Sequence, residues 1–439
     1  MSILIGFAVF LGAVVVCLVR DWSLIWAMCL GIIFFALPGH RRGNSWKTLL
    51  HMAWTPAKKM LPVFITYALI GCITALWRSA GTIAFCIYYG LQMVTPKLFL
   101  LVTFLMTSAI AFALGTSFGV VGTAGIILMA LGRTGGVDPA MTAGIILAGA
   151  YCGDRCSNAS SSAALVAAST GTKVEDNVKM MLRTGALPYI VTLVIYGFMS
   201  WRNPITTVDG ALLETLQGGF RMTWWAIVPA ALMIFLPICR VPIKLAMAVS
   251  AASAFAVTLA VQGGRVFPTL WAAVAGYIPA DAHLRDVMSG GGMVSMLSAS
   301  LLMISTAMFA GLLDGLAILD GTRRLICRTA EKWGRFPATT AAMVLCGLVF
   351  CNQSTGAVVT PQLVGEAYED AAPGELAQDM ENSGIVLTAL IPWNISVSIP
   401  LMMLEASSRA IPYAVLLYMI PACYGLTKKH FYFKEEKGK

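Results

Sequence analysis

Runs of apolar residues follow one another along nearly the whole chain, and this succession constrains the fold more than any other feature. Examples are residues 3–18, 98–114 and 187–199. A bilayer core offers the backbone no water to bond with, so only helices or closed barrels cross it. The runs have helical lengths, and they predict an all-α polytopic membrane protein with about 10 to 12 transmembrane helices. Only 12% of the residues are charged, about half the share of a soluble protein, which excludes an ordinary soluble domain.

Composition also excludes several functional classes. The net charge of +9 comes from dispersed basic residues with no basic helix interleaved with aromatic residues, which argues against nucleic-acid binding. Most of the eleven cysteines stand inside apolar runs, and the four histidines are scattered, so we expect no zinc site and no cofactor other than a transported or coupling ion. No pattern of nucleophile and base stands out, so the chain is predicted to be a carrier and not an enzyme.

Two basic clusters predict the orientation of the chain. His40-Arg41-Arg42 follows the second apolar run, and Lys428-Lys429 follows the last one. Basic residues next to membrane spans stay on the cytoplasmic side, so both termini are expected there. No basic residue precedes the first apolar run, which is typical of an uncleaved first helix.

A polar stretch at residues 201–223 divides the chain into two halves. We expect six segments: an N-terminal hairpin with a basic cytoplasmic loop (1–60), a first transport repeat (61–200), a polar linker (201–223), connecting helices (224–292), a second transport repeat (293–426) and a basic cytoplasmic tail (427–439).

Polar breaks at matched positions indicate that the two transport segments repeat each other. A first break lies at Gly115 to Gly119 in one half and at Cys351 to Gly356 in the other. A second lies at Asp154 to Ser157 and at Pro392 to Asn394, a similar distance further along in each half. Broken helices at corresponding positions are typical of secondary transporters with inverted repeats, so two such repeats are predicted, each with a re-entrant or broken helix.

The stretch from Gly149 to Ser162 places a carboxylate, a guanidinium and several hydroxyls between strongly apolar residues. Ionisable groups at membrane depth are costly and usually face a pathway for ions or substrate. The glycines and serines favour a locally unwound helix whose carbonyls and hydroxyls coordinate a cation. The alternative is a structural pair of Asp154 and Arg155 that pins two helices together.

Further candidates for binding cations, protons or an organic solute lie at the other breaks. Close packing of small residues would also account for Thr116 and Ser117, and interhelical hydrogen bonds would account for Asn352 and Gln353. Glu381, next to an apolar run, could carry a proton. The remaining candidates are Ser157 and Asn394 as cation ligands, and Arg155 and Ser161 as holders of an organic solute.

These motifs resemble the NhaC-type sodium/proton antiporter family of the ion transporter superfamily. The matching pieces are Ser79 to Ile83 with Tyr88 to Leu91, Gly115 to Gly119, Gly149 to Ser157, Cys351 to Gln353 and Leu390 to Asn394. The resemblance covers most of the chain and implies an inverted-repeat carrier in a bacterial plasma membrane.

The chain departs from the family pattern at four positions. Asn158 stands where proline is common, Ser161 where many members have aspartate, Ala164 where many have asparagine, and Asn382 where an acidic residue is common. Proton exchange needs a titratable carrier, so Asp154 and Glu381 would have to suffice in this chain.

The leading prediction is sodium/proton antiport. Asp154 would bind sodium and protons in alternation, and Glu381 would be an auxiliary titrating group. Sodium would be the transported or coupling ion, with Thr116, Ser157, Asn352 and Asn394 as oxygen ligands. The alternative is sodium-coupled transport of a small amino acid or carboxylate held by Arg155. Beyond the lipid bilayer, sodium and protons, two partners stay open: a small organic solute and a second copy of the chain in a homodimer.

Overall fold

The computed structural model describes residues 3–20, 22–59, 61–93, 95–205, 210–239, 241–281, 284–316, 323–372 and 374–432. Within these ranges every named element is helical, and the one β-type contact is an isolated bridge between Tyr277 and Gly290. The all-α membrane fold is therefore confirmed.

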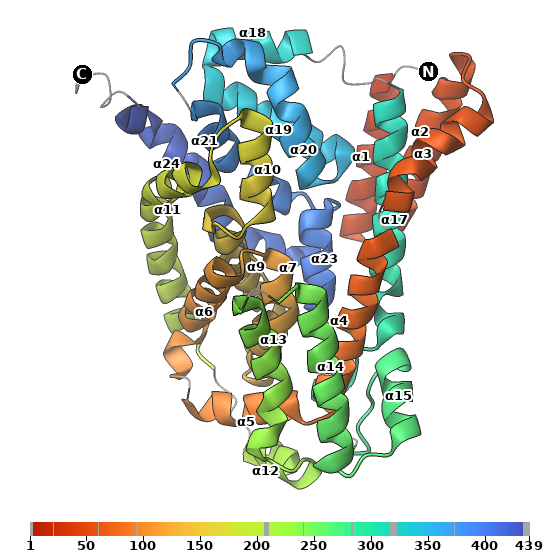
Figure 1. The fold of residues 1–439 in the computed structure, drawn as a ribbon, viewed down its shortest axis with the longest axis vertical. Helices are drawn as coiled ribbons and strands as arrows, with labels where there is room; N and C mark the ends of the chain where they lie inside the picture. Colours follow the sequence, from red (N-terminus) through yellow and green to blue (C-terminus); the bar gives the residue numbers. More distant parts are fainter. Residues whose placement is uncertain are drawn as a thin grey trace.

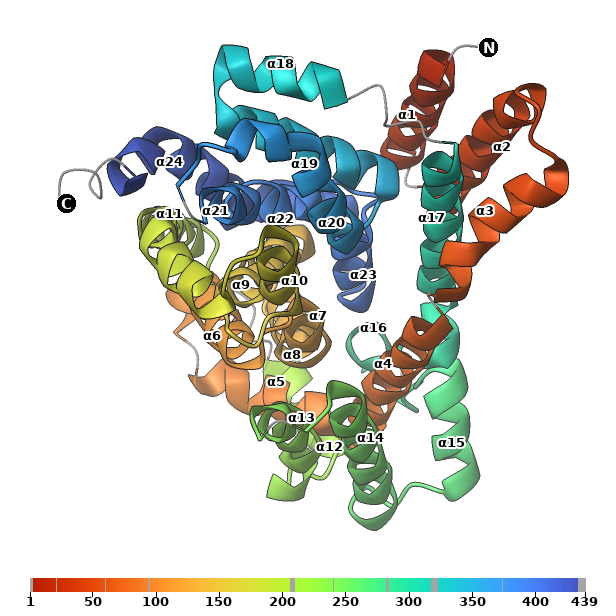
Figure 2. The ribbon, with the colours of Figure 1, turned by 45° about the horizontal axis from the view of Figure 1, so that its top comes forward.

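One side of the molecule is a layer of long helices from both halves of the sequence. α2, α3 and α17 lie side by side along it, with α1 against α2 (Figure 2). Phe309 of α17 stacks on Phe10 of α1 with the ring centroids 4.5 Å apart. The bounds are α1 (Ile3–Val19), α2 (Ile25–Arg41), α3 (Trp46–Lys59) and α17 (Leu297–Gly315).

A second group of helices continues this layer toward the lower end of the molecule in Figure 1. α4 packs against α14 and α15, and the indole of Trp77 donates a 3.0 Å hydrogen bond to Ser250 Oγ, which joins α4 to α14. The bounds are α4 (Leu61–Ser79), α12 (Gly210–Gly219), α13 (Val228–Ile238), α14 (Ile243–Ala260), α15 (Val266–Ala275) and α16 (Arg285–Met288).

The first repeat packs around α9. A Cβ atom added at Gly153 of α9 would lie 1.9 Å from the carbonyl carbon of Ala111, so α6 and α9 approach closely. The bounds are α5 (Thr82–Met93), α6 (Phe99–Leu114), α7 (Ser117–Val120), a π-helical turn (Val121–Gly125), α8 (Ile126–Thr134), α9 (Pro139–Cys156), α10 (Ser161–Thr170) and α11 (Val174–Arg202).

The second repeat lies beside the first (Figure 2). α20 packs against α10, and α23 packs against α9. The bounds are α18 (Arg323–Trp333), α19 (Arg335–Phe350), α20 (Gln353–Val364), α21 (Glu375–Glu381), α22 (Gly384–Leu387), α23 (Ile395–Met403) and α24 (Val415–Tyr432).

The breaks have the same backbone geometry in both repeats. Gly115 and Cys351 both adopt the left-handed conformation, with φ of 65° and 53°. Each is followed by an extended residue that caps the next helix, Thr116 or Asn352. The second breaks end at Ser160 and Asn394, with φ of −71° and −72°. Glycine adopts a positive φ readily, but Cys351 does so at an energetic cost, so the second repeat reproduces this turn against the preference of its residue.

The second breaks run in opposite directions along the molecule. The chain rises from α9 to α10 in Figure 1, and it descends from α21 to α23. Opposite directions for equivalent elements are what inverted repeats require. The start of α1 and the end of α24 lie toward the same end of the molecule, as termini on one side of a membrane require (Figure 1).

Fewer single helices are long enough to cross a membrane than the predicted count of crossings. Among the described residues four helices meet the length and hydropathy requirement, or six if each of two bent pairs counts as one span. The bends measure 65° between α4 and α5 and 52° at the break before α23. Seven shorter apolar helices of 10–17 residues also lie in the described ranges, so the predicted number of crossings stays a prediction.

The predicted segment boundaries stay predictions, with two differences in local structure. The stretch expected to be a polar linker contains α12 and the last residues of α11, and its residues 206–209 lie outside the described residues. The predicted basic tail begins inside α24, and residues 433–439 also lie outside them.

Candidate functional site

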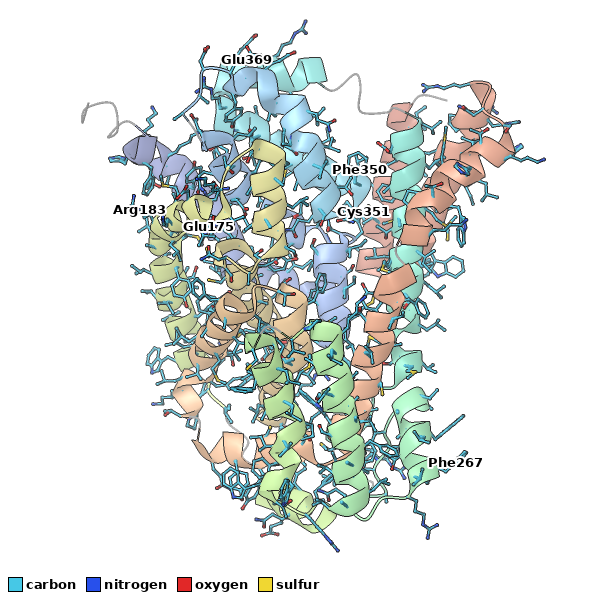
Figure 3. The ribbon with its side chains drawn as sticks, in the orientation of Figure 1. Glu175, Arg183, Phe267, Phe350, Cys351 and Glu369 are labelled. Carbon is cyan, nitrogen blue, oxygen red and sulfur yellow. The ribbon has the colours of Figure 1, made fainter. Side chains whose placement is uncertain are left out.

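The breaks of the two repeats contact each other in the interior. The amide of Ile395 donates a 2.9 Å hydrogen bond to the carbonyl of Cys351, which joins the two breaks of the second repeat. Tyr151 of α9 donates a 2.7 Å hydrogen bond to the carbonyl of Ser396 and links the first repeat to the second. Figure 3 shows Cys351 in the upper half of the molecule, below Glu369 at the top and far above Phe267 near the bottom, and Cys351 is fully buried. A site at these breaks would therefore lie deep within the molecule.

Asp154 stands in the last turn of α9, directly before the break. Its side chain is buried, and its Oδ2 accepts a 3.2 Å hydrogen bond from Ser162 Oγ. The Ser160 hydroxyl donates to the Asp154 backbone carbonyl, which ties the two sides of the break together. Among the ion pairs of the described residues none involves Asp154. The interpretation of Asp154 and Arg155 as a structural pair is therefore wrong.

A chain of side-chain hydrogen bonds runs from Asp154 into the second repeat. Gln353 Nε2 donates to Ser162 Oγ at 3.4 Å, and Gln353 Oε1 accepts from Ser396 Oγ at 3.0 Å. Asp154, Ser162, Gln353 and Ser396 thus form a polar path from α9 and α10 to α20 and α23. Two of its members, Asp154 and Gln353, were predicted from the sequence.

The other predicted cation ligands lie at helix starts or breaks. The side chains of Thr116, Asn352 and Asn394 accept hydrogen bonds from Gly119, Ser354 and Ser396 amides at 3.4, 2.9 and 3.0 Å. These bonds occupy one lone pair of each oxygen and leave another. Ser117 is buried in α7, which packs against α9 and α23. Ser157 is buried too, and its Oγ accepts from the amide of Ala159 at 3.2 Å.

Arg155 is used to hold helices together. Its Nη2 donates to the carbonyl of Met181 at 3.2 Å, to Thr184 Oγ1 at 3.1 Å and to Asn382 Oδ1 at 2.6 Å. The guanidinium thereby connects α9 to α11 and to the residue that follows α21. Asn382 is the position where the family pattern favours an acid, and here it serves as a neutral partner of Arg155.

Glu381 is a fully buried carboxyl group with neither oxygen hydrogen-bonded to a described residue. It interacts electrostatically with Arg155 and Asp154. A charged carboxylate is costly in such a place, and protonation removes most of that cost. Glu381 therefore has the surroundings of a group that holds a proton.

Asp379, two residues earlier, has the opposite surroundings. Its carboxylate accepts from Tyr368 and Tyr424 hydroxyls at 2.5 and 2.9 Å and from Lys428 Nζ at 2.5 Å. Lys428 also pairs with Glu375 at 2.7 Å. This network fastens α24 to α21, so Asp379 has a structural role.

Sequence reasoning missed two serines of the polar path. Ser161, predicted as a solute contact, is exposed, whereas Ser162 contacts Asp154. Ser162 and Ser396 each lie two residues after a capping residue and donate their amides to that cap, Ser160 or Asn394. A serine at the second position after a capping residue is the signal that could have identified both.

The ligands that the described residues offer at this site are oxygen atoms. The described residues include no group of three or more histidine, cysteine or acidic residues placed to hold a metal. Hydroxyls, amide oxygens, carbonyls and one carboxylate at broken helices suit an alkali cation.

Comparison with known proteins decides the family. The sequence profile of the Na+/H+ antiporter family matches residues 1–201 and 163–426. The chain belongs to the Na+/H+ antiporter family. Members named NhaC are among its relatives, so the resemblance found in the sequence is confirmed. As a member of this transporter family it is a multi-pass membrane protein.

Three curated relatives differ in the cargo that their names state. The chain is 28% identical to the malate-2H(+)/Na(+)-lactate antiporter of Bacillus subtilis (90% of this chain, 84% of the relative). It is 24% identical to the Na(+)/H(+) antiporter NhaC of Alkalihalophilus pseudofirmus (76% and 74%). It is 25% identical to the arginine/ornithine antiporter ArcD of Halobacterium salinarum (76% and 70%).

Proposed function

We propose that this member of the Na+/H+ antiporter family exchanges sodium ions for protons across the bacterial plasma membrane. The observation that carries the proposal is the place of Asp154: a buried carboxylate without an ion-pair partner among the described residues, at a helix break joined to the second repeat. Three relatives named as Na(+)/H(+) antiporters support the same cargo.

Sodium would bind between the breaks of the two repeats. Asp154 supplies the negative charge, and Thr116, Ser157, Asn352 and Asn394 supply neutral oxygens. Ser117, Ser162 and Gln353 position these groups through packing and hydrogen bonds. Unwound backbone next to such residues adds carbonyl oxygens, as in other transporters with broken helices.

A single carboxylate that takes either a proton or sodium makes the exchange obligatory. When Asp154 is ionised it attracts sodium, and when it is protonated that attraction is lost. Glu381 gives the site a second exchangeable proton, held near Asp154 without hydrogen-bond partners among the described residues. The protein needs no cofactor for this exchange beyond the ions themselves.

The alternative of sodium-coupled carboxylate or amino acid transport rested on Arg155 as the solute holder. Its terminal nitrogens are engaged by Cys156, Met181, Thr184 and Asn382. Solute binding there would break the contacts that join α9 to α11. For this reason sodium/proton exchange is the function that the geometry supports better.

The test uses purified protein in proteoliposomes with an internal pH dye and an imposed proton gradient. We expect sodium alone to dissipate the gradient, and Asp154→Asn to abolish the response. The matched control is Asp176→Asn, which removes an exposed aspartate of α11 that pairs with Lys179. This variant should behave like the wild type. Sodium-driven proton flux that survives in Asp154→Asn would remove Asp154 from the mechanism. A gradient that sodium leaves intact would rule out sodium/proton antiport.

A further inference from the structure

A second polar cluster lies apart from the broken helices, where α4, α8 and α23 end close together. Glu405 follows α23 in the left-handed conformation, with φ of 51°. Its Oε1 accepts from Arg78 Nη2 at 3.1 Å, and its Oε2 accepts from Arg133 Nη1 at 3.0 Å. Arg78 belongs to the last turn of α4, and Arg133 to the last turn of α8. One carboxylate thus faces two guanidinium groups.

The two arginines differ in how far their donors are used. Arg133 Nη2 also donates to the carbonyls of Leu404 and Glu405, at 2.9 and 2.6 Å. The Nε and Nη1 atoms of Arg78 are buried and have no hydrogen-bond partner among the described residues. The Arg78 side chain is only 9% exposed. Buried donors of a charged group without acceptors are costly, so Arg78 can take a further acceptor in addition to Glu405.

A cavity of about 210 Å³ lies against this cluster. Arg78, Arg133, Glu405 and Thr74 form its polar part, and Met129 and Met296 belong to its larger apolar wall. A water takes about 30 Å³ of liquid volume, so a solute with a few heavy atoms fits the space. The cavity therefore has a positively charged side and an apolar side, and a small molecule can contact both.

The charge balance selects the class of ligand. Two guanidinium groups and one carboxylate leave one positive charge uncompensated among the described residues that line the cavity. A second negative charge on the ligand would be repelled by Glu405. The apolar wall suits a hydrocarbon chain and gives nothing to an inorganic ion.

We propose that this cavity binds a short-chain organic monocarboxylate, with its carboxylate on Arg78 and its hydrocarbon part against the methionine wall. In this arrangement the unused donors of Arg78 would serve the ligand while Nη2 keeps its bond to Glu405. Charge-assisted hydrogen bonds of this kind are stronger than neutral ones and suit a guanidinium donor. The site uses none of the residues of the proposed cation site.

Binding is tested on the purified protein by its thermal unfolding midpoint, with propionate as the probe. Sodium propionate replaces sodium chloride at constant total salt, so sodium and ionic strength stay fixed. We expect a saturating rise of the midpoint in propionate, and none with propionamide, which keeps the shape but lacks the charge. An equal rise with propionamide, or a midpoint that is the same in propionate and chloride, would overturn the proposal.

Two variants locate the site. Arg78→Lys keeps the charge beside Glu405 but removes the unused donors, and Ala130→Leu fills the cavity from its wall without altering an ion pair. Each should raise the half-saturating propionate concentration at least tenfold. Arg202→Lys, at the exposed end of α11, should leave it unchanged. An unchanged half-saturation in Arg78→Lys or Ala130→Leu would also overturn the proposal.

A third variant separates this cavity from the cation site. In Asp154→Asn the propionate effect should persist, because Asp154 does not line the cavity. Loss of the effect in that variant would place the carboxylate at the cation site and overturn the proposal. Sodium/proton exchange is measured separately, so its failure and the failure of this proposal are distinguishable.

Discussion

At the scale of single residues, two acidic side chains of α21 make opposite contributions to stability. Glu381 has no hydrogen-bond partner among the described residues, whereas Asp379 has two hydroxyls and an ammonium group. We expect Glu381→Gln to leave the unfolding midpoint unchanged or raised, because a neutral amide replaces an uncompensated acid. Asp379→Asn should destabilise the protein by about 1.5 to 3 kcal/mol, because it removes the charge that two tyrosine hydroxyls and Lys428 contact, while Lys428 keeps its pair with Glu375. Denaturation of the purified variants measures both, and equal destabilisation by the two changes would contradict this contrast.

Glu405 makes the stability of the folded protein depend on pH. Burial raises its pKa, but Arg78 and Arg133 together lower it by more, so its pKa lies below the ordinary value of 4.5 in the folded protein. A carboxyl group with a lowered folded pKa stabilises the fold above its unfolded pKa, and this contribution is lost as the pH falls through the folded value. Glu405→Gln should therefore be less stable than the wild type at pH 7, and the difference should shrink below about pH 4.5. Melting curves across this range test it, and a difference that widens in acid would refute the assignment.

At the scale of elements, the close approach of α6 and α9 sets the shape of the candidate site. A Cβ at Gly153 would lie within 2.1 Å of two Ala111 backbone atoms, so the helices would have to move apart. We expect Gly153→Ala to lower both the unfolding midpoint and sodium-driven proton flux, since Asp154 is the next residue. The matched control is Gly197→Ala in α11, where the nearest atom is 4.0 Å away. It should be neutral or slightly stabilising, because alanine favours a helix over glycine by about 0.5 to 1 kcal/mol. If Gly153→Ala changed neither the unfolding midpoint nor the proton flux, the contact between α6 and α9 could accommodate a methyl group, which would contradict this prediction.

The breaks between elements were predictable, and the partners across them were not. Gly115 and the polar run at residues 352–355 indicate interrupted helices by their residue types alone. The hydrogen bond from Gln353 to Ser162 joins residues far apart in the sequence, and no local preference encodes such a contact. Arg155 shows the same limit, because its sequence neighbour Asp154 suggested an ion pair, whereas Thr184 and Asn382 hold it. Glu405 and Arg78 were missed since each is an ordinary charged residue near a helix end.

At the scale of the whole molecule, the candidate site exists only when both repeats are present. The polar path starts at Asp154 and passes through Gln353 to Ser396, so neither half contains it alone. We expect a chain divided between residues 205 and 210 to regain sodium-driven proton flux when both pieces are produced together. Each piece alone should be inactive while still entering the membrane. Flux from the first piece alone would show that one repeat is sufficient.

The same dependence has a consequence for biosynthesis. Asp154 enters the membrane long before the ribosome has made Gln353, and the helix that carries Ser396 follows later still. During this interval the carboxylate lies among hydroxyls of its own repeat and lacks the groups that complete the path to the second one. A half-made chain therefore has no working exchange route. A cell can therefore insert many copies at once without unfinished ones dissipating its ion gradients.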